Sequence, residues 1–374
     1  MTRALQLLAV LGAFAPLARA EGLEEILDKY NQEDKFQGVA LVARGESVLL
    51  HKALGPAEFV WETPLTPDAR FPICNLTETF TAVLALRQVE KGALRLDQTV
   101  GDFWPSLKET LAGTVTLEQI MMRKSGLANV EHIGPDISPA VAVVPDDVSW
   151  FWRTRDPRIG DLQKSAELML SRKPVSSPGF GRVNPTDYIV LGAILEKVTE
   201  KPFAELLETE IIAPLGLQDT MVLNSTKFVP KLASSALRAV GGLHPGPSIR
   251  WENSQSGMGL ASSARDLHRW AMAVMEGKLL NPASTKKLFG YDDQFLSPFG
   301  TSMPVPFGDS RHETVELLGA VGAYRIQLSM LPEQKIVVIL LSGSNNFNPK
   351  PISRQANLPY ELATAALANK SVAQ

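Results

Sequence analysis

Runs of β-forming residues stand at both ends of this chain, separated by a long helical block, and this pattern restricts the possible folds most. Near the start, residues 38–42 and 48–51 are β-rich on either side of a polar turn, as in a hairpin. Near the end, residues 314–318, 323–331 and 335–341 are apolar and β-branched. Neither end has enough strands to bury a sheet face alone. We therefore predict one antiparallel sheet built from both ends.

The block between the two ends, residues 77 to about 288, has apolar residues mainly at helical spacing. Its predicted helices cover residues 79–91, 117–122, 187–199, 203–212 and 264–276. Two more helices are predicted near the chain ends, over residues 23–30 and about 359–369. Proline and glycine crowd residues 134–157 and 297–308, which predicts long surface loops there.

These elements predict an α/β fold of the α+β kind, in which helices flank an antiparallel sheet that carries a large helical insertion. We expect one domain over residues 21–374. Its sheet part is predicted at about residues 21–74 and 290–374, and its helical part at about residues 75–289.

The first twenty residues have the features of a secretory signal peptide. Met1–Arg3 is positively charged, Ala4–Leu17 is mostly apolar, and Ala18–Ala20 is a small-x-small cleavage triplet. Cleavage after Ala20 would give a secreted or periplasmic product. No later apolar run approaches the roughly 20 residues that a membrane span needs, so we expect no integral membrane segment in the mature chain.

Composition excludes several classes of function. The 37 Lys and Arg residues nearly balance the 40 Asp and Glu residues, so the chain has no electrostatic footprint for nucleic acid. A single cysteine, Cys74, rules out an intramolecular disulfide and any cysteine-based metal cage. The five histidines are scattered without ligand spacing. We therefore predict no metal and no cofactor.

A series of segments stands in an order and at spacings that recur in one known family. These segments are Leu65–Ala82, Lys124–Leu127, Pro178–Gly179, Asp187–Thr199, Ala213–Leu217 and Gly259–Leu267. Together they resemble the serine β-lactamase and penicillin-binding protein superfamily, in its class C β-lactamase-like and esterase-like branch. The resemblance spans about residues 36–345 and implies that family's fold and its acyl-transfer chemistry.

The first motif of that family is altered in this chain. The family has SxxK, a serine at a helix start with a lysine one turn later, because the serine needs a neighbouring base to become nucleophilic. Here Asn75 stands at the nucleophile position and Glu78 at the base position. A carboxamide cannot form the acyl-enzyme, and a carboxylate cannot supply the positive charge of lysine.

The second motif, Tyr-x-Asn, is altered as well, because its loop is one residue short. Counting back from Tyr188 puts Val183 at the tyrosine position and Pro185 at the asparagine position. Matching Asn184 to the asparagine instead puts Arg182 at the tyrosine position. Neither register restores a tyrosine.

The third motif is a basic residue, then any residue, then glycine on a strand. It appears here as Leu317-Leu318-Gly319, followed a few residues later by Tyr324. The basic residue is lost and the glycine remains. Three separate losses at one site favour a pseudoenzyme over a single accidental substitution.

Asn75 and Glu78 have a possible structural role of their own. Asparagine is a favoured N-cap residue, and a glutamate three positions later can reach back to the cap's backbone amide, as in a capping box. We therefore predict a helix-capping pair at this position. The alternative is that Glu78 acts as a general base that activates water.

The charge at residue 78 affects which ligands the site can hold. The family binds carboxylate-bearing ligands with basic groups, and a glutamate turns that attraction into repulsion. At about 4 Å and an effective dielectric of about 20, one charge pair is worth roughly 4 kcal/mol before screening. We expect weak binding of such anions unless Arg182, Arg325 or Lys124 faces the site.

We interpret the chain as a non-catalytic homologue of these hydrolases that binds a cell-envelope ligand or a protein partner. The candidate binding residues are Asn75, Glu78, Arg182, Asn184, Leu317, Gly319 and Tyr324. One alternative is an active hydrolase with rebuilt chemistry at Cys74, at Thr77 or through a water activated by Glu78. Another is a structural envelope protein whose cleft is filled by side chains.

Overall fold

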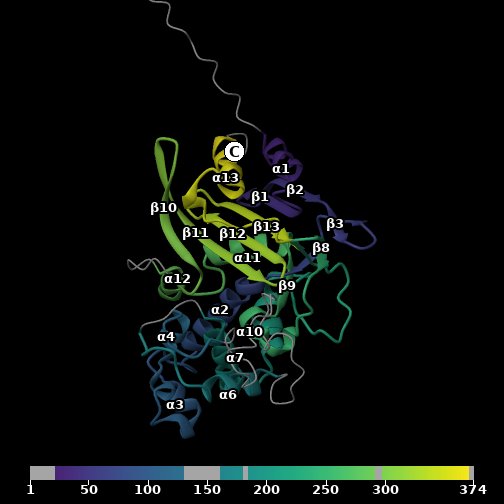
Figure 1. Ribbon diagram of the computed structural model, residues 1–374. Helices are drawn as coiled ribbons and strands as arrows, with labels where there is room; N and C mark the ends of the chain where they lie inside the picture. The colour runs from purple at the N-terminus through teal and green to yellow at the C-terminus, as the bar shows by residue number, and fades with distance from the viewer. Residues whose placement is uncertain (1–21, 130–160, 180–183, 291–296, 370–374) are drawn as a thin grey trace, which may run out of the picture.

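The computed structural model describes residues 22–129, 161–179, 184–290 and 297–369 (Figure 1). The predicted signal peptide, the predicted loop at 134–157 and Arg182 therefore lie outside the described residues. Among the helices that are described, none combines the length and the apolar character needed to cross a membrane.

The two chain ends meet in one antiparallel sheet with the strand order β10-β11-β12-β13-β1-β2. Its strands are β1 (Gly38–Arg44), β2 (Ser47–Leu54), β10 (Thr301–Phe307), β11 (Ser310–Val321), β12 (Tyr324–Leu331) and β13 (Ile336–Ser342). The junction is the pairing of β1 with β13, in which Val39 faces Leu341 and Arg44 faces Ile336. The predicted sheet is confirmed, and with it the fold class.

Both faces of the central strands are buried, which explains why these strands are almost continuously apolar. Along β1, Val39 and Leu41 belong to the large core on the helical side, whereas Ala40 and Val42 belong to a smaller core on the other side. This alternation follows from the two-residue period of a strand.

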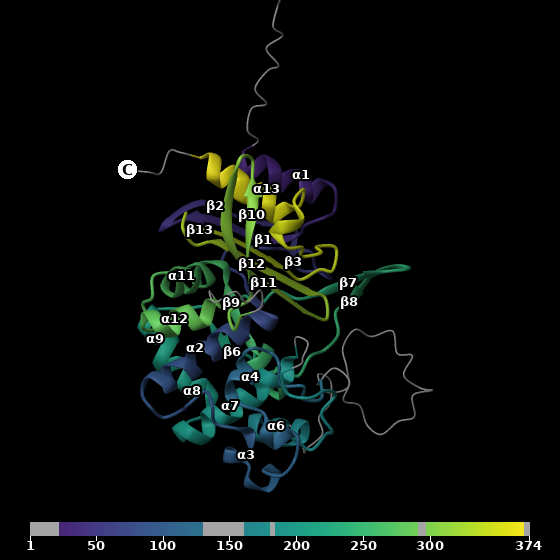
Figure 2. The ribbon, with the colours of Figure 1, turned by 90° about the vertical axis from the view of Figure 1, so that its left-hand side faces the viewer.

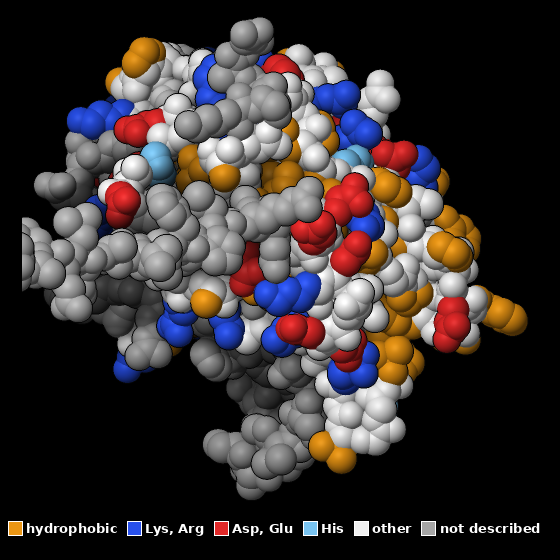
Figure 3. All heavy atoms as spheres, turned by 90° about the horizontal axis from the view of Figure 1, so that it is seen from above, with side chains coloured by type: hydrophobic (Ala, Val, Ile, Leu, Met, Phe, Trp, Pro, Cys, Tyr) orange, Lys and Arg blue, Asp and Glu red, His pale blue; other side chains and the backbone are white. Residues whose placement is uncertain are grey.

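Helices cover each face of the sheet (Figures 1 and 2). On the outer face, α1 (Leu23–Gln32) packs against α13 (Leu358–Ala368), and the Tyr30 hydroxyl donates to Glu361 Oε1 at 2.8 Å. On the inner face, α11 (Ala264–Met275) contacts β1 and β13. Seen from above, the described surface carries interspersed positive and negative side chains (Figure 3). Such a surface is typical of a solvated face.

The helical part lies on the α11 side of the sheet (Figure 1). Its helices include α2 (Thr77–Glu90), α3 (Val100–Phe103), α4 (Leu117–Met121), α6 (Leu162–Leu170), α7 (Pro185–Thr199), α8 (Phe203–Leu207), α10 (Gln255–Met258) and α12 (Pro282–Phe289). Most residues of α2 and α7 are buried, because these two helices form the centre of the large core. The Phe80 ring on α2 stacks on Trp270 of α11 with centroids 3.9 Å apart.

Two parts of the secondary-structure prediction were wrong. Strand β10 occupies most of the predicted loop at 297–308, and its Pro304 and Pro306 are tolerated because β10 is an edge strand. The helical block also contains short strands that its helical spacing did not indicate. They are β6 (Met221–Val222), β9 (Leu260–Ser263) and the hairpin β7 (Ala236–Ala239) with β8 (Gly242–Pro245). Strand β9 also pairs with β5 (Arg70–Pro72), which lies just before the block.

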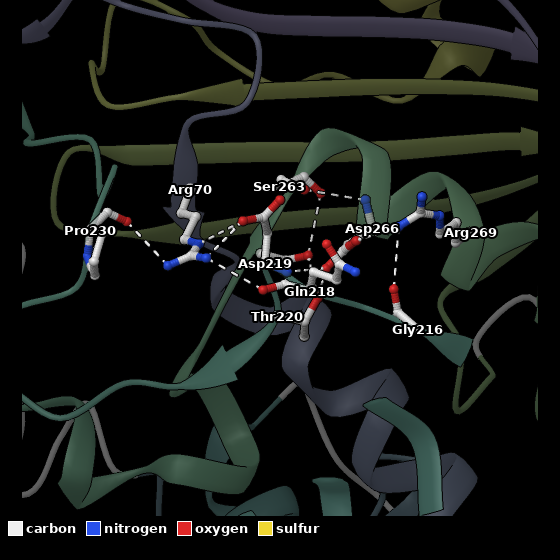
Figure 4. A network of polar contacts seen from close by, with 10 residues as sticks. Arg70, Gly216, Gln218, Asp219, Thr220, Pro230, Ser263, Asp266 and Arg269 are labelled. Atoms are coloured by element: carbon white, nitrogen blue, oxygen red, sulfur yellow. Dashed lines mark hydrogen bonds and ion pairs between the residues drawn. The ribbon is translucent and has the colours of Figure 1, made fainter. Parts of the chain in front are cut away.

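A polar network holds the start of α11 to these short strands (Figure 4). The Arg70 guanidinium donates to Asp219 Oδ1 through Nε at 3.0 Å and Nη2 at 2.7 Å. Asp266, in the first turn of α11, accepts the Asp219 backbone N–H at 2.7 Å and the Thr220 hydroxyl at 2.9 Å. These bonds satisfy groups that would otherwise be buried without partners, so the network is structural.

Candidate functional site

Asn75 lies at the start of α2, where the sequence places the altered nucleophile. It is the middle residue of a 3-10 turn, η1 (Cys74–Leu76), that leads directly into the helix. The preceding Cys74 has a φ of 50°, which is unusual for a residue other than glycine. This turn leaves Asn75 half-buried, while Cys74 and Leu76 are buried on either side of it.

Glu78 is fully buried and forms an ion pair with Arg123, which follows α4. Glu78 Oε2 lies 2.6 Å from Arg123 Nη2 and accepts from Arg123 Nε at 2.9 Å. The other carboxylate oxygen, Oε1, accepts from Asn75 Nδ2 at 3.2 Å. Burial raises the pKa of the Glu78 carboxyl, and the Arg123 cation partly offsets that effect.

The predicted capping box is therefore wrong. Helix α2 begins at Thr77, and its N-cap, Leu76, makes no side-chain capping hydrogen bond. Glu78 instead turns toward Arg123, because a buried carboxylate is stabilised far more by a paired guanidinium than by a backbone amide. Asn75 and Glu78 still interact, but through their side chains.

Arg123 is the residue of this site that the sequence analysis missed. Its side chain also donates to the carbonyl of Ser297 at 2.7 Å and lies over the Tyr188 ring, with Cζ 4.9 Å from the centroid. The expected repulsion from Glu78 is thus neutralised by a cation other than those we named. Arg325, which was named, donates instead to the carbonyls of Gly322 and Tyr324.

Behind this ion pair lies a second buried carboxyl, Asp187 on α7. Its Oδ1 accepts a hydrogen bond from the Ser125 hydroxyl, and its Oδ2 has no hydrogen-bond partner among the described residues. Burial raises the pKa of Asp187 well above its ordinary value, and the charge of Glu78 adds to the increase. The hydrogen-bond partner of the Asp187 carboxyl is thus the Ser125 hydroxyl, whereas Arg123 is paired with Glu78.

The second-motif region is used structurally. Asn184 caps α7 by accepting the Thr186 backbone N–H at 3.1 Å, and its amide donates to the Leu127 carbonyl at 2.9 Å. Pro185 is the first residue of the helix, where a missing N–H costs nothing. Both polar ends of the Asn184 side chain are therefore engaged.

The three remaining predicted residues lie along β11 and β12. Leu317 is buried in the large core, and Gly319 is the point at which β11 packs directly against η1. Tyr324 lies at the start of β12, and its hydroxyl donates to the Ala233 carbonyl at 3.0 Å. The structure thus brings Asn75, Glu78 and Gly319 together, whereas Tyr324 is held by a different segment.

Substitution of Gly319 by alanine should destabilise the protein by about 1–3 kcal/mol, because the contact with η1 is already tight. A Cβ added there would lie 3.1 Å from Cys74 Cβ and 3.2 Å from the Ile73 carbonyl oxygen. Urea unfolding measures the effect. The control is Ala320→Ser at the next, exposed position, and equal stabilities of the two variants would contradict the close approach.

Within the described residues, no group of three or more His, Cys, Asp or Glu side chains is arranged to hold a metal ion. His312 and Glu313, which begin a partial zinc-binding pattern in the sequence, lie on strand β11 rather than on a helix.

The comparisons with known proteins agree on one family. A family model described as Beta-lactamase matches residues 23–358. Penicillin-binding protein 4* of Bacillus subtilis is 26% identical over 206 residues, which cover 54% of this chain and 41% of that protein. Esterase EstB of Burkholderia gladioli is 28% identical over 205 residues, which cover 54% of this chain and 50% of that protein. The alignments thus span half or less of these two relatives.

Other similarities extend over more of the chain. Teichoic acid D-alanine hydrolase of Staphylococcus aureus is 23% identical over 344 residues, which cover 89% of this chain and 78% of that protein. Among solved structures, FmtA from Staphylococcus aureus has a TM-score of 0.73 at 20% identity, covering 91% of this chain and 86% of that one. A class C beta lactamase from Rhodobacter sphaeroides has a TM-score of 0.68 at 19% identity, and the match covers 92% of this chain and 99% of that one.

Proposed function

The chain belongs to the beta-lactamase family, and from that premise we propose that it is a non-catalytic member that binds a ligand or protein in the cell envelope. We further propose that residues 21–374 form the mature, secreted or periplasmic domain. The relatives named for penicillin binding and for teichoic acid D-alanine hydrolysis support an envelope role.

The observation that carries this proposal is the ion pair at the base position. Acyl transfer in this family needs a hydroxyl or thiol nucleophile next to a base. Here the nucleophile position holds the Asn75 carboxamide, and the base position holds a carboxylate whose oxygens are occupied by Arg123 and Asn75. These contacts favour a binding role over catalysis, because they engage both oxygens of Glu78 while Asn75 stays half-buried.

The rival hydrolase with rebuilt chemistry has less support. Cys74 is fully buried, and burial raises the pKa of its thiol to about 12, so little thiolate forms at neutral pH. Thr77 is also buried, and its hydroxyl accepts the Leu260 backbone N–H at 3.3 Å. Glu78 would have to leave Arg123 before it could take a proton from water.

We expect the purified protein to form no covalent adduct with a fluorescent penicillin and to hydrolyse no chromogenic ester above the buffer rate. Intact-mass spectrometry and absorbance measure these two results, with a catalytically active penicillin-binding protein as the positive control. A drug-derived mass increase or turnover would contradict the proposal. Cys74→Ser, Thr77→Ala and Glu78→Gln would then identify the group responsible.

The binding role needs its own measurement. Soluble peptidoglycan fragments and D-alanylated teichoic acid can be titrated by calorimetry into the wild type and into Asn75→Ala. We expect binding that the Asn75 substitution weakens. Absence of binding by every envelope fragment and by extracted envelope proteins would favour a structural role instead.

A further inference from the structure

A buried carboxyl group stands on the face of the sheet opposite the candidate site. Glu316 on β11 is 3% exposed, and its Oε1 and Oε2 accept the Ile352 backbone N–H at 3.0 and 2.8 Å. Ile352 opens a 3-10 turn, η8 (Ile352–Arg354), between β13 and α13. We refer to residues 350–356 as the strap.

In the part of the chain that the structure describes, no counter-ion faces Glu316. Its partners across the sheet are Thr301 on β10 and Ser329 on β12, both uncharged. Among the described residues, only burial and the backbone N–H groups of Ile352 and Ser353 act on its ionisation. Burial is the larger effect and raises the pKa of Glu316 to about 7.

The charged and titratable groups on the neighbouring elements have other contacts or contribute nothing to this ionisation. Strand β10 contains no charged residue, and Arg325 on β12 donates to two backbone carbonyls at the hairpin turn. Tyr360 on α13 donates to the Pro306 carbonyl at 3.1 Å. Lys350 and Arg354 on the strap are not among the groups that act on Glu316.

The same face of the sheet holds an acceptor that suits a protonated Glu316. Gln327 on β12 is fully buried, and its Nε2 donates to Ser329 Oγ at 3.1 Å and to the Lys350 carbonyl at 3.0 Å. Its Oε1 is buried and has no hydrogen-bond partner within the described ranges. A buried acceptor without a donor is costly. Glu316 bonds to Ile352 and Gln327 to Lys350, so both side chains hold the same strap, and a protonated carboxyl has a hydroxyl to donate.

The strap is held by few bonds and contains unfavourable backbone. Besides the contacts to Glu316 and Gln327, the Asn357 amide donates to the Pro351 carbonyl at 3.0 Å. Two consecutive residues, Gln355 and Ala356, have φ values of 48° and 47°, which disfavour both side chains. Opening of the strap releases this strain but exposes the buried Ile352 side chain.

We propose that Glu316 makes the strap a pH-sensitive clasp, which stays seated while this carboxyl is protonated and opens more often once it ionises. In the open strap Glu316 is in water and has its ordinary pKa near 4.5, below the value of about 7 in the seated form. Protonation therefore favours the seated form. The stabilisation is complete below about pH 4.5 and is lost as the pH rises through about 7.

The clasp acts on the strand that lines the candidate site. Strand β11 continues from Glu316 into Leu317 and Gly319, whose side of the sheet faces η1. When the strap opens, it uncovers the face of β11 that carries Glu316. The opposite face of β11 packs against the turn that contains Asn75.

Amide hydrogen exchange on the full protein tests the clasp. We expect the protection factors of the Ile352 and Ser353 amides, corrected for intrinsic exchange, to fall by about 70-fold between pH 5 and pH 8. In Glu316→Gln the carboxyl cannot ionise, so the protection should be the same at both pH values. The matched control is Glu313→Gln on the same strand, which should keep the wild-type fall.

Two results would overturn the proposal. One is a wild-type protection factor that changes less than twofold between the two pH values, and this measurement decides the question even if Glu316→Gln does not fold. The other is a Glu316→Gln protein that folds and keeps the wild-type pH dependence.

Discussion

Replacing Glu78 with lysine, the residue that the resemblance to the family implies at this position, should leave the protein unfolded at 25 °C. The substitution removes the partner of a buried guanidinium, which costs about 3–5 kcal/mol. It also places a second positive charge beside Arg123, which adds roughly 4 kcal/mol at an effective dielectric of about 20. The combined cost is comparable with the whole stability of a typical domain. Far-ultraviolet circular dichroism and urea titration measure the result.

A double variant in which both charges are reversed tests whether the loss of the ion pair causes this unfolding. In Glu78→Lys with Arg123→Glu, opposite charges face each other again, so we expect a folded protein. Glu118→Lys is the control, because Glu118 forms an exposed ion pair with Lys287 at 3.2 Å, and such pairs contribute little. A Glu78→Lys protein with nearly wild-type stability would contradict the importance of the buried pair.

Replacing Arg123 with methionine should lower the free energy of unfolding by about 3–5 kcal/mol, because it leaves the Glu78 carboxylate buried without a counter-ion. Burial then raises the pKa of Glu78 against the Asn75 hydrogen bond alone, which favours uptake of a proton on folding. Since the pKa in the folded state is the higher one, the variant should be more stable in mild acid than in mild base. Urea titrations at two pH values measure both effects.

A double-mutant cycle isolates the pair itself. Glu78→Gln combined with Arg123→Met removes both charges, so the double variant should be more stable than Arg123→Met alone. Lys287→Met, which removes the cation of an exposed pair, should cost less than about 1 kcal/mol. If the losses in the free energy of unfolding caused by the two single substitutions add up to the loss in the double variant, the ion pair is not the source of the destabilisation.

The fold could be predicted because its central strands are buried on both faces. The runs predicted at 323–331 and 335–341 match β12 and β13 to within one residue at each end, since almost every position there contacts a core. The edge strand β10 could not be predicted in the same way. Its prolines suggest a loop until the order of the strands is known.

At the candidate site, the resemblance predicts which residues differ from the family's motifs but not what those residues contact. Asn75 and Glu78 were found because a known motif fixes their positions, but Arg123 lies 45 residues from Glu78. From the sequence alone, Lys124, the next residue along the chain, was an equally acceptable candidate for the cation of the site. A buried carboxylate is stabilised by a buried cation, and this tendency could have directed attention to Arg123 once Glu78 was expected to be buried.

The two prolines of β10 also affect how copies of this chain can associate. An exposed sheet edge can recruit a strand from another molecule, and this is a route to swapped dimers and fibrils. Pro304 and Pro306 remove two amide donors from that border. The border formed by β2 keeps its donors, and any growth of the sheet by added strands is therefore favoured on that side.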